Sequence, residues 1–186
     1  PNGAVFTLCA LPDGALAASG TFTAMGRVST NGVALWNGSS WNALGAGLDA
    51  PAYTFASLPN GQLLAGGIFG TAGAAVANGI AKWDGAFWTP LGTGTNGAVN
   101  AIVVLPNGHV LVGGTFTTAG GVPCNRIARW NGSSWSSLGS GITGNSVQAF
   151  ATLPSGDIVC AGTFTAIDGT PANNIARWNG TSWFAL

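Results

Sequence analysis

Very little of this sequence is charged. Its 186 residues include five Lys and Arg together and five Asp, with no Glu, so the formal net charge is zero. A nucleic-acid backbone or an anionic membrane surface is bound through clustered Lys and Arg, and this chain cannot supply such a cluster. No apolar run reaches the roughly 18 residues of a membrane-spanning helix. We therefore expect neither a nucleic-acid partner nor insertion into a membrane.

Cysteine and histidine are also scarce. The three cysteines, Cys9, Cys124 and Cys160, show no C-x-x-C pair, and their number is odd. Such a pattern predicts neither a disulfide framework nor a zinc site, so we expect the thiols to pack as small apolar residues. His109 is the only histidine and follows a Pro-Asn-Gly turn, which favours an exposed surface position over a ligand role.

What dominates the sequence is a repeat of about 47 residues, a period typical of propellers or helical arrays. The phrase Leu-Pro-x-Gly begins at Leu11, Leu58, Leu105 and Leu153. A pair of tryptophans follows each of these leucines at a constant distance: Trp36 and Trp41, Trp83 and Trp88, Trp130 and Trp135, Trp178 and Trp183. The last period is one residue longer, and the constant distance places the extra residue between Trp135 and Leu153.

Each repeat contains four short runs rich in β-forming residues, separated by Gly, Pro and Asn. In the third repeat these runs are 99–105, 109–116, 126–130 and 134–138. Asn-Gly and Asp-Gly favour the tight turns of hairpins, and they join the first run to the second and the third to the fourth. The longer loop between the second and third runs has a composition unsuited to a helix. Each repeat is therefore predicted to be a four-stranded sheet.

Tryptophan occurs only in the repeated pairs, which predicts a structural role for all eight side chains. Large flat rings fill the gap between packed sheets, so the indoles are expected to anchor neighbouring sheets at a fixed distance. A Phe also recurs shortly after a Gly, at Phe22, Phe69, Phe116 and Phe164. The Gly indicates a close approach of two backbones at this position.

The phrases "VLVGGTF" and "RIARWNGSSW" of the third repeat resemble the kelch repeat, in which a Gly pair ends the second strand and a Trp opens the fourth. They are still more similar to kelch-like propeller repeats of bacterial secreted and surface proteins, the delta-60 type. The resemblance covers all four repeats and implies an all-β propeller with blades 1–47, 48–94, 95–141 and 142–186. The first and fourth repeats depart from the Gly pair, with Ser19-Gly20 and Ala161-Gly162.

The resemblance also bears on assembly. Kelch-like blades more often form rings of six or more, whereas propellers in general have about four to eight blades. A half-ring would expose two apolar blade faces, and burying them against a second chain would give eight blades. We therefore expect a homodimer that completes an eight-bladed ring, with a four-bladed monomer as the alternative.

No catalytic constellation is predicted. The five carboxylates, Asp13, Asp49, Asp84, Asp157 and Asp168, lie mostly in or beside turns, where Asp is a preferred residue. One His and one Tyr cannot build the copper site of kelch-type oxidases within one chain, and a Ser nucleophile would depend on the single His. Lys82, Arg129 and Arg177 share one repeat position and are expected to be solvated charges. We predict no enzyme, no metal and no cofactor.

The longer connections emerge at one end of each predicted sheet, and their sequences vary more than the tight turns. Variable loops on a rigid scaffold often carry function. At the start of the first run, one position holds Phe6, Tyr53, Asn100 and Gln148; together with Arg27 and Asp168 these residues form the candidate ligand face. Aromatic and amide side chains suit sugars or extended peptides.

The leading hypothesis is thus a non-catalytic scaffold that binds a protein or a glycan through this face. The alternatives are a structural repeat array or excised fragment without a ligand of its own and, remotely, a hydrolase. Scarce charge and the resemblance favour a location outside a bacterial cell or on its surface.

Overall fold

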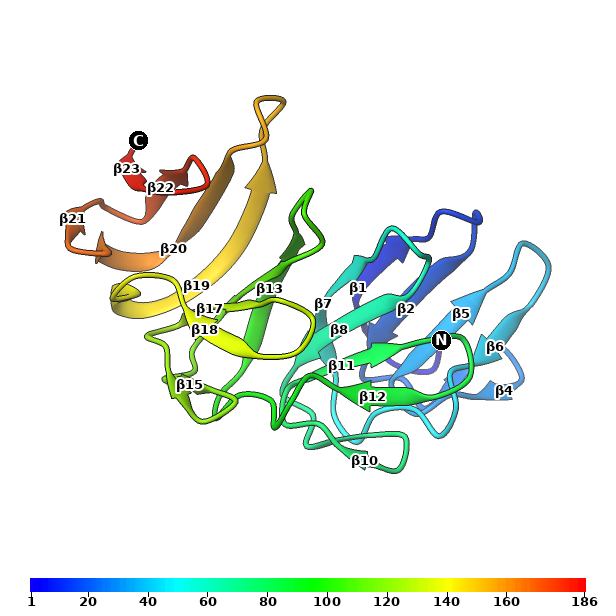
Figure 1. Ribbon diagram of the computed structural model, residues 1–186. Coiled ribbons are helices and arrows are strands. Elements are labelled where there is room, and N and C mark those ends of the chain that lie inside the picture. Colours follow the sequence, from blue (N-terminus) through cyan, green and yellow to red (C-terminus); the bar gives the residue numbers. More distant parts are fainter. The chain divides into compact units, whose positions relative to one another are not determined.

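The computed structural model describes all 186 residues, and every regular element in it is a β-strand (Figure 1). The chain divides into two compact units, Pro1–Gly94 and Thr95–Leu186. Each unit contains two large antiparallel sheets, one from each sequence repeat, besides short two-stranded hairpins. This confirms the prediction of an all-β chain built from four-stranded antiparallel sheets.

The first unit holds the first and second sheets. The first sheet has the order β1 (Val5–Ala10), β2 (Leu16–Gly20), β5 (Val33–Trp36) and β6 (Trp41–Ala43). The second has β7 (Ala52–Ser57), β8 (Leu63–Gly67), β11 (Ile80–Trp83) and β12 (Trp88–Pro90) in the same order. In both sheets, sequence neighbours pair through tight turns, so each sheet is a simple meander apart from one longer connection.

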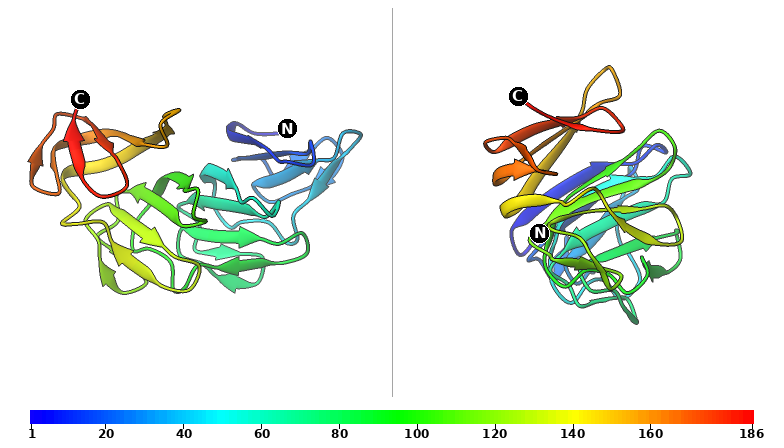
Figure 2. Two further views of the ribbon diagram at one scale, coloured as in Figure 1. Left: turned by 45° about the horizontal axis from the view of Figure 1, so that its top comes forward. Right: turned by 60° about the vertical axis from the view of Figure 1, so that its left-hand side comes forward.

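The second unit holds the third and fourth sheets. The third sheet consists of β13 (Val99–Val104), β14 (Val110–Gly114), β17 (Ile127–Trp130) and β18 (Trp135–Ser137). The fourth consists of β19 (Ile142–Thr152), β20 (Ile158–Ile167), β22 (Ile175–Trp178) and β23 (Trp183–Ala185), and β21 (Thr170–Pro171) pairs with the end of β20. Figure 2 shows from two further sides that the strands within each sheet lie next to one another.

The longer connections contain short hairpins that the sequence did not predict. They are β3 (Ala24–Met25) with β4 (Val28–Ser29), β9 (Thr71–Ala72) with β10 (Ala75–Val76), and β15 (Thr118–Ala119) with β16 (Val122–Pro123). Each strand has only two residues, too few for a period-2 pattern to be visible. These hairpins give the long loops a defined backbone path.

The fourth sheet differs from the others because its first strand is longer. Ile142 pairs with Ile167 just as Leu48 pairs with Ala72 in the second repeat. The register then shifts between Thr143 and Ser146, in addition to the shift between Val147 and Ala149 that has an equivalent in the other three sheets. The one additional residue of the last repeat therefore lies within 144–146, inside β19, and the ladder absorbs it as an irregularity.

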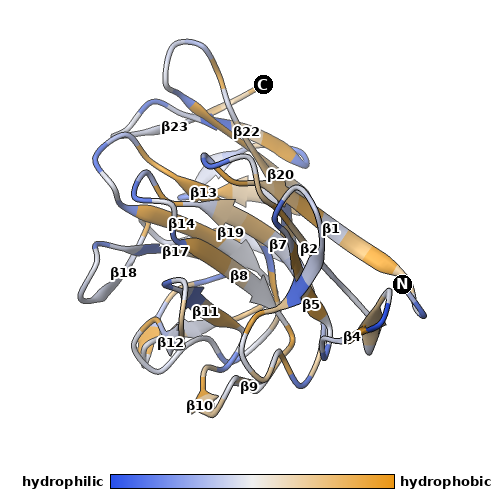
Figure 3. Ribbon diagram, turned by 90° about the vertical axis from the view of Figure 1, so that its right-hand side faces the viewer, coloured by the Kyte–Doolittle hydropathy of each residue, from blue (hydrophilic) through white to orange (hydrophobic).

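In the first unit, the core lies between the two sheets. Val33 and Leu44 of the first repeat pack with Ala52, Phe69 and Trp88 of the second, and all five side chains are buried. All five residues of β8 are buried, and because successive side chains point to opposite faces, this strand contributes to the packing on both sides. Figure 3 shows hydrophobic colouring along the strands and hydrophilic colouring at most turns.

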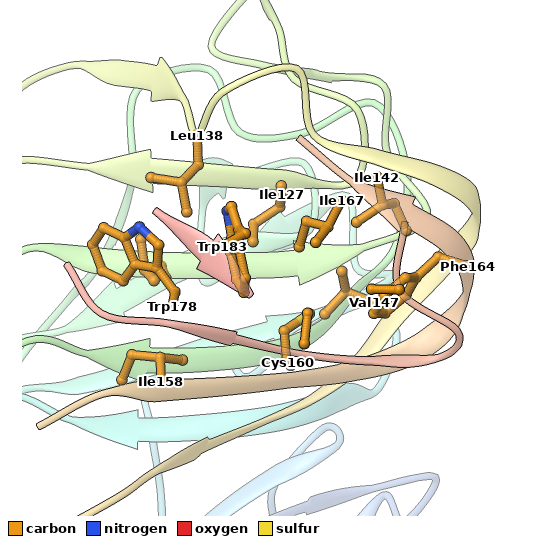
Figure 4. Close-up of a cluster of buried hydrophobic side chains, with 14 of the residues drawn as sticks. Ile127, Leu138, Ile142, Val147, Ile158, Cys160, Phe164, Ile167, Trp178 and Trp183 are labelled. Carbon is orange, nitrogen blue, oxygen red and sulfur yellow. The ribbon is translucent and has the colours of Figure 1, made fainter. Parts of the chain in front are cut away.

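The second unit has an equivalent core between its two sheets (Figure 4). Ile127 and Leu138 of the third repeat pack with Val147, Phe164 and Trp183 of the fourth. These residues occupy the same repeat positions as those of the first unit, so the same sheet-to-sheet interface occurs in both units.

The two tryptophans of each pair lie opposite one another on neighbouring strands, with ring centroids 5.6, 5.4, 5.2 and 6.3 Å apart from the first pair to the fourth. Trp88, Trp135, Trp178 and Trp183 are buried, whereas the other four are partly exposed. The Nε1–H of Trp88 donates a 2.9 Å hydrogen bond to the carbonyl of Leu44. This indole therefore joins the second sheet to the first both by packing and by a polar contact.

Candidate functional site

An open groove of about 520 Å³ lies in the first unit, at the end where the longer connections emerge. Its walls come from the long connection of the first sheet, the connector between the two sheets, and the start of the long connection of the second sheet. The polar lining side chains are Thr21, Thr23, Asn31, Asp49 and Thr71. The groove thus offers hydroxyl, amide and carboxylate groups together with exposed backbone.

Side-chain hydrogen bonds fix the walls of this groove. Oδ1 of Asp49 accepts hydrogen bonds from the backbone N–H groups of Gly70 and Thr71, at 2.9 and 3.0 Å. Nδ2 of Asn31 donates to the carbonyl of Ala46 at 2.9 Å. Gly47, with φ of +81°, lies so close to Asn31 that a Cβ would collide with it. The groove is therefore a rigid feature of the sheet connections.

The bond made by Asn31 recurs along the chain. Asn78 donates to the carbonyl of Thr93 and Asn125 to that of Ser140, each at 2.9 Å. In the first three repeats, the variable loop thus ends in a constant Asn that ties it to the connector that follows its sheet. Sequence reasoning missed this role, although the recurring Asn in otherwise variable loops was its signal.

Two predicted ligand-face residues lie together beside the groove. Phe6 on β1 and Tyr53 on β7 are 50% and 37% exposed, and their ring centroids are 6.2 Å apart. Pro51 lines the groove, and Tyr53 lies two residues further along the chain. The structure therefore places an exposed aromatic pair next to the polar groove within one unit.

The amide members of the predicted face lie in the second unit. Asn100 is partly buried, and its Nδ2 donates a 3.0 Å hydrogen bond to the carbonyl of Val147 in the fourth sheet. Gln148 is exposed, with Nε2 3.4 Å from Oγ1 of Thr163. Asn100 thus joins two sheets, while Gln148 remains accessible to a ligand.

The two charged members lie in turns of different units. Arg27 is exposed in the β3–β4 hairpin, and Asp168 lies in the turn between β20 and β21 with φ of +48°. Oδ1 of Asp168 accepts a 2.8 Å hydrogen bond from the backbone N–H of Ser140 and lies 3.3 Å from its hydroxyl. The carboxylate of Asp168 therefore secures a connector.

A second, apolar pocket of about 470 Å³ lies at the outer edge of the second sheet. Trp83, Phe87 and Trp88 line it together with Ala74 and Ala75. Phe87 is 72% exposed, and the equivalent residue is Ser in the other three repeats (Ser40, Ser134 and Ser182). Sequence reasoning missed this pocket, although the departure of "WDGAFW" from "WNGSSW" marks it.

Several ionisable groups make local structural contacts. Two backbone N–H groups, of Phe87 and Ala86, donate to Asp84 and lower the pKa of its carboxyl. Arg177 forms a 3.2 Å ion pair with Asp157 and lies 5.2 Å from the centroid of the Phe184 ring. No three His, Cys, Asp or Glu side chains gather as metal ligands would. No helix is present that is long and apolar enough to span a membrane.

Cys160 gives a prediction for alkaline pH. The thiol is fully buried, and desolvation raises its pKa from 9.0 to about 12. Because the pKa of this thiol is higher in the folded state than in the unfolded state, the neutral thiol makes its full contribution to the free energy of unfolding below about pH 9. This contribution is lost between about pH 9 and about pH 12, at about 1.4 kcal/mol per pH unit.

Urea unfolding across this pH range measures the slope. The control is Cys160→Val, which introduces the residue found at the equivalent position of the third repeat, Val112. We expect the variant to lose less stability than the native protein as pH rises. Equal slopes for the two proteins would contradict the prediction.

Comparison with known proteins places these features in a family context. The family model of the Rax2 C-terminal β-propeller domain matches residues 87–183, just over half of the chain. Among solved structures, the extracellular domain of the one-component system BT4673 from B. thetaiotaomicron aligns with a TM-score of 0.61 and 9% identity, over 96% of this chain and 22% of that one. No curated protein matches the chain.

A second structure, YCF48 bound to D1 peptide, aligns with a TM-score of 0.55 and 17% identity, over 97% of this chain and 53% of that one. The chain thus spans about a fifth and about half of the two proteins. At these identities the likeness is one of fold.

Proposed function

This chain belongs to the family of the Rax2 C-terminal β-propeller domain, and from that premise we propose that it is a non-catalytic binding module of a β-propeller. The observation that carries the proposal is the polar groove of the first unit with the aromatic pair Phe6 and Tyr53 beside it. We include in the proposal that its repeats are of the kelch-like, delta-60 type, on the basis of the Gly pairs and paired tryptophans.

The groove supports binding rather than catalysis. Its one carboxylate, that of Asp49, already accepts two backbone hydrogen bonds, and neither a His nor a Cys lines it. Catalysis by general acid–base or nucleophilic chemistry needs at least two cooperating groups within reach of one another. The lining groups can instead hydrogen-bond a ligand, so we propose that the protein is not an enzyme and uses no cofactor.

The proposed ligand is an extended chain, either a glycan or a peptide segment of a protein. Aromatic rings provide a flat apolar surface, while hydroxyl and backbone groups fix orientation. YCF48, which shares the fold, was solved bound to D1 peptide. We further propose an extracellular or bacterial cell-surface location, with no nucleic-acid partner, because charge is scarce and BT4673 contributes an extracellular domain of this fold.

Replacing the aromatic pair tests the ligand site. The double variant Phe6→Ala/Tyr53→Ala should weaken binding to its best glycan or peptide at least tenfold, because it removes about 1.4 kcal/mol or more of ring contact. Screening the native protein on glycan and peptide arrays identifies the probe, and titration calorimetry then measures Kd. Both side chains are substantially exposed, so the variant is expected to fold.

The matched control is Phe87→Ala, which removes an exposed ring from the opposite edge of the second sheet. We expect its Kd to equal that of the native protein. A loss of binding confined to the Phe87 variant would move the site to the outer apolar pocket.

A structural array without a ligand is the second candidate. It is favoured by the hydrogen bonds that tie Asn31, Asn78, Asn125 and Asp168 into the connectors. Under this alternative the native, folded protein gives no signal on either array.

We also propose that two chains assemble into one eight-bladed ring, each chain contributing four blades. Propellers contain about four to eight blades, and four-stranded sheets with repeated interfaces fit such a ring. The alternative is a ring of four blades within a single chain.

A further inference from the structure

The outer apolar pocket of the second sheet is lined by side chains that the other repeats do not share. The hairpin between the two tryptophans carries two hydroxyl residues in each of the other three repeats: Ser39 and Ser40, Ser133 and Ser134, and Thr181 and Ser182. In the second repeat these positions hold Ala86 and Phe87, which line the pocket together with the paired tryptophans. Phe87 is 72% exposed, and leaving so large an apolar ring in water is unfavourable. The aromatic side chains therefore form one wall of a candidate ligand site.

Three small residues, Gly45, Ala46 and Gly73, also line this pocket. The first two belong to the connector that follows the first sheet, and Gly73 lies in the β9–β10 hairpin, beside β12 (Figure 1). The N–H of Gly73 donates a 2.8 Å hydrogen bond to the carbonyl of Gly47 in the connector. This bond fixes the connector and the hairpin relative to each other.

The second unit contains the same arrangement, with a carboxylate in it. Asp168 holds the repeat position of Gly73, and its N–H donates to the carbonyl of Gly141 at 2.7 Å. The two backbones match, because φ is +48° at Asp168 and +59° at Gly73. Oδ1 of Asp168 accepts a 2.8 Å hydrogen bond from the N–H of Ser140, and a Cβ added to Gly139 would overlap the same carboxyl group. The carboxylate thus fills the corner between the connector and the hairpin.

In the first unit this corner is open. Ala46 holds the position of Ser140. Gly45 holds that of Gly139, and their φ values are +60° and +63°. Because Gly73 has no side chain, the N–H of Ala46 lacks the carboxylate that its equivalent bonds. Ala46 is exposed, so a ligand with an acceptor oxygen can reach this donor.

The open corner adjoins the aromatic wall. A Cβ added to Gly45 would lie 3.2 Å from the ring of Trp83 and 3.8 Å from that of Trp88. One molecule can therefore touch the N–H of Ala46 and the aromatic rings at once. The pocket volume of about 470 Å³ is within the range of about 300 to 1,000 Å³ for small-molecule sites.

From this geometry we infer that the pocket binds a small aromatic acid, whose carboxylate takes the place that the carboxylate of Asp168 holds in the second unit. The N–H of Ala46 donates to it, and the ring packs against Trp83 and Phe87. A carboxylate is the bound group because the chain itself uses one there, and a charge-assisted hydrogen bond is stronger than a neutral one. Ala46 and Gly73 also line the polar groove, so the two sites adjoin, but neither ligand depends on the other.

Phenylacetate, an aromatic ring with one carboxylate, is the probe, and the first test uses the native protein. Calorimetric titration should give a Kd of about 1 mM or below, as for a small ligand of moderate efficiency. The neutral analogue phenylacetamide has the same shape and should bind at least about threefold more weakly, because its hydrogen bond is not charge-assisted. Equal Kd values would overturn the carboxylate as the bound group, and no detectable binding would overturn the site itself.

Two-dimensional NMR spectra of the native protein locate the probe. The amide resonances of Ala46 and Phe87 should shift as phenylacetate is added, since the first donates to the carboxylate and the second contacts the ring. The resonances of Thr21 and Thr23, which line the groove and not the pocket, should stay in place. Shifts confined to Thr21 and Thr23 would place the acid in the groove and contradict the inference.

Gly73→Asp supplies the carboxylate from the chain itself, as Asp168 does. A Cβ at Gly73 meets no atom closer than 3.5 Å, and Asp tolerates positive φ better than most residues, so the variant should fold. It should bind phenylacetate about tenfold more weakly or worse, because its own side chain occupies the corner. Gly73→Ala is the matched control, which adds a Cβ without a carboxylate and should lose less than about threefold. An unchanged Kd in Gly73→Asp, with the fold checked by circular dichroism, would overturn the corner as the binding point.

Two further variants change one contact each. Ala46→Ser adds a hydroxyl, which in Ser140 lies 3.3 Å from Oδ1 of Asp168, and should tighten phenylacetate binding about twofold or more. Phe87→Ser restores the residue of the other repeats and should weaken binding about threefold or more. Val76→Ala is the control for it, since Val76 is 66% exposed in β10 and does not line the pocket. Equal losses in Phe87→Ser and Val76→Ala would show that the aromatic wall does not hold the ring.

Discussion

Trp88→Ala is expected to destabilise the protein by about 4 kcal/mol, within the range of about 3 to 5 for truncating a buried Trp. The indole is only 6% exposed and fills the space between the first and second sheets. It also contacts the ring of Trp83 in a tilted arrangement and donates to the carbonyl of Leu44. Truncation leaves a cavity and removes one of the two hydrogen bonds that this carbonyl accepts, the other coming from the N–H of Gly47. Urea unfolding followed by tryptophan fluorescence and circular dichroism measures the loss.

Two further variants separate packing from the hydrogen bond. Trp88→Phe keeps an aromatic ring but no donor, so it should cost less than Trp88→Ala and still more than the about 1 kcal/mol of a typical hydrogen bond. Phe87→Ala, at a side chain that is 72% exposed, should change stability by about 0.5 kcal/mol or less. If Trp88→Ala cost no more than this control, the tryptophans would have no anchoring role.

Gly67→Ala should cost about 3 kcal/mol, at the upper end of typical overpacking losses. Gly67 ends β8 and pairs with Ala52 at the start of β7. A methyl group at Gly67 would overlap the carbonyl oxygen of Pro51 and come within 2.7 Å of the Cα of Ala52. Because both neighbours are backbone atoms, they cannot move aside without breaking the strand pair.

Gly70→Ala is the matched control for this substitution. Gly70 lies three residues further along the same segment, and the nearest atom to an added Cβ is Oδ2 of Asp49 at 3.4 Å. That contact is ordinary, so we expect a loss of about 1 kcal/mol or less. Equal losses in the two variants, measured by urea unfolding, would show that backbone approach at Gly67 is not what requires glycine.

The four-stranded sheets were predictable because local chemistry specifies them. The runs 99–105, 109–116, 126–130 and 134–138 contain β13, β14, β17 and β18. Asn-Gly and Asp-Gly fix hairpins through backbone preferences of the dipeptide itself. The two-residue strands of the long loops were not predicted, because their pairing depends on a turn rather than on a hydrophobic pattern.

The candidate site was predictable only in part. Phe6 and Tyr53 were named from their shared repeat position, and the structure places their rings 6.2 Å apart. The role of Asp168 was not foreseen, since its partner Ser140 lies 28 residues away and is brought near by the path of the chain. The groove itself is formed by three separate segments and largely by backbone atoms. A pattern of residue types does not predict a groove of this kind.

The period, the four-stranded unit and the absence of clustered charge follow from residue types and their spacing alone. The hydrogen bonds that hold individual side chains, the position of the groove and the exposure of apolar residues depend instead on how the sheets pack. Val5 and Ala52 occupy one repeat position, yet one is 41% exposed and the other fully buried. The difference arises because burial depends on the sheet that lies opposite, and this is a property of the packed chain.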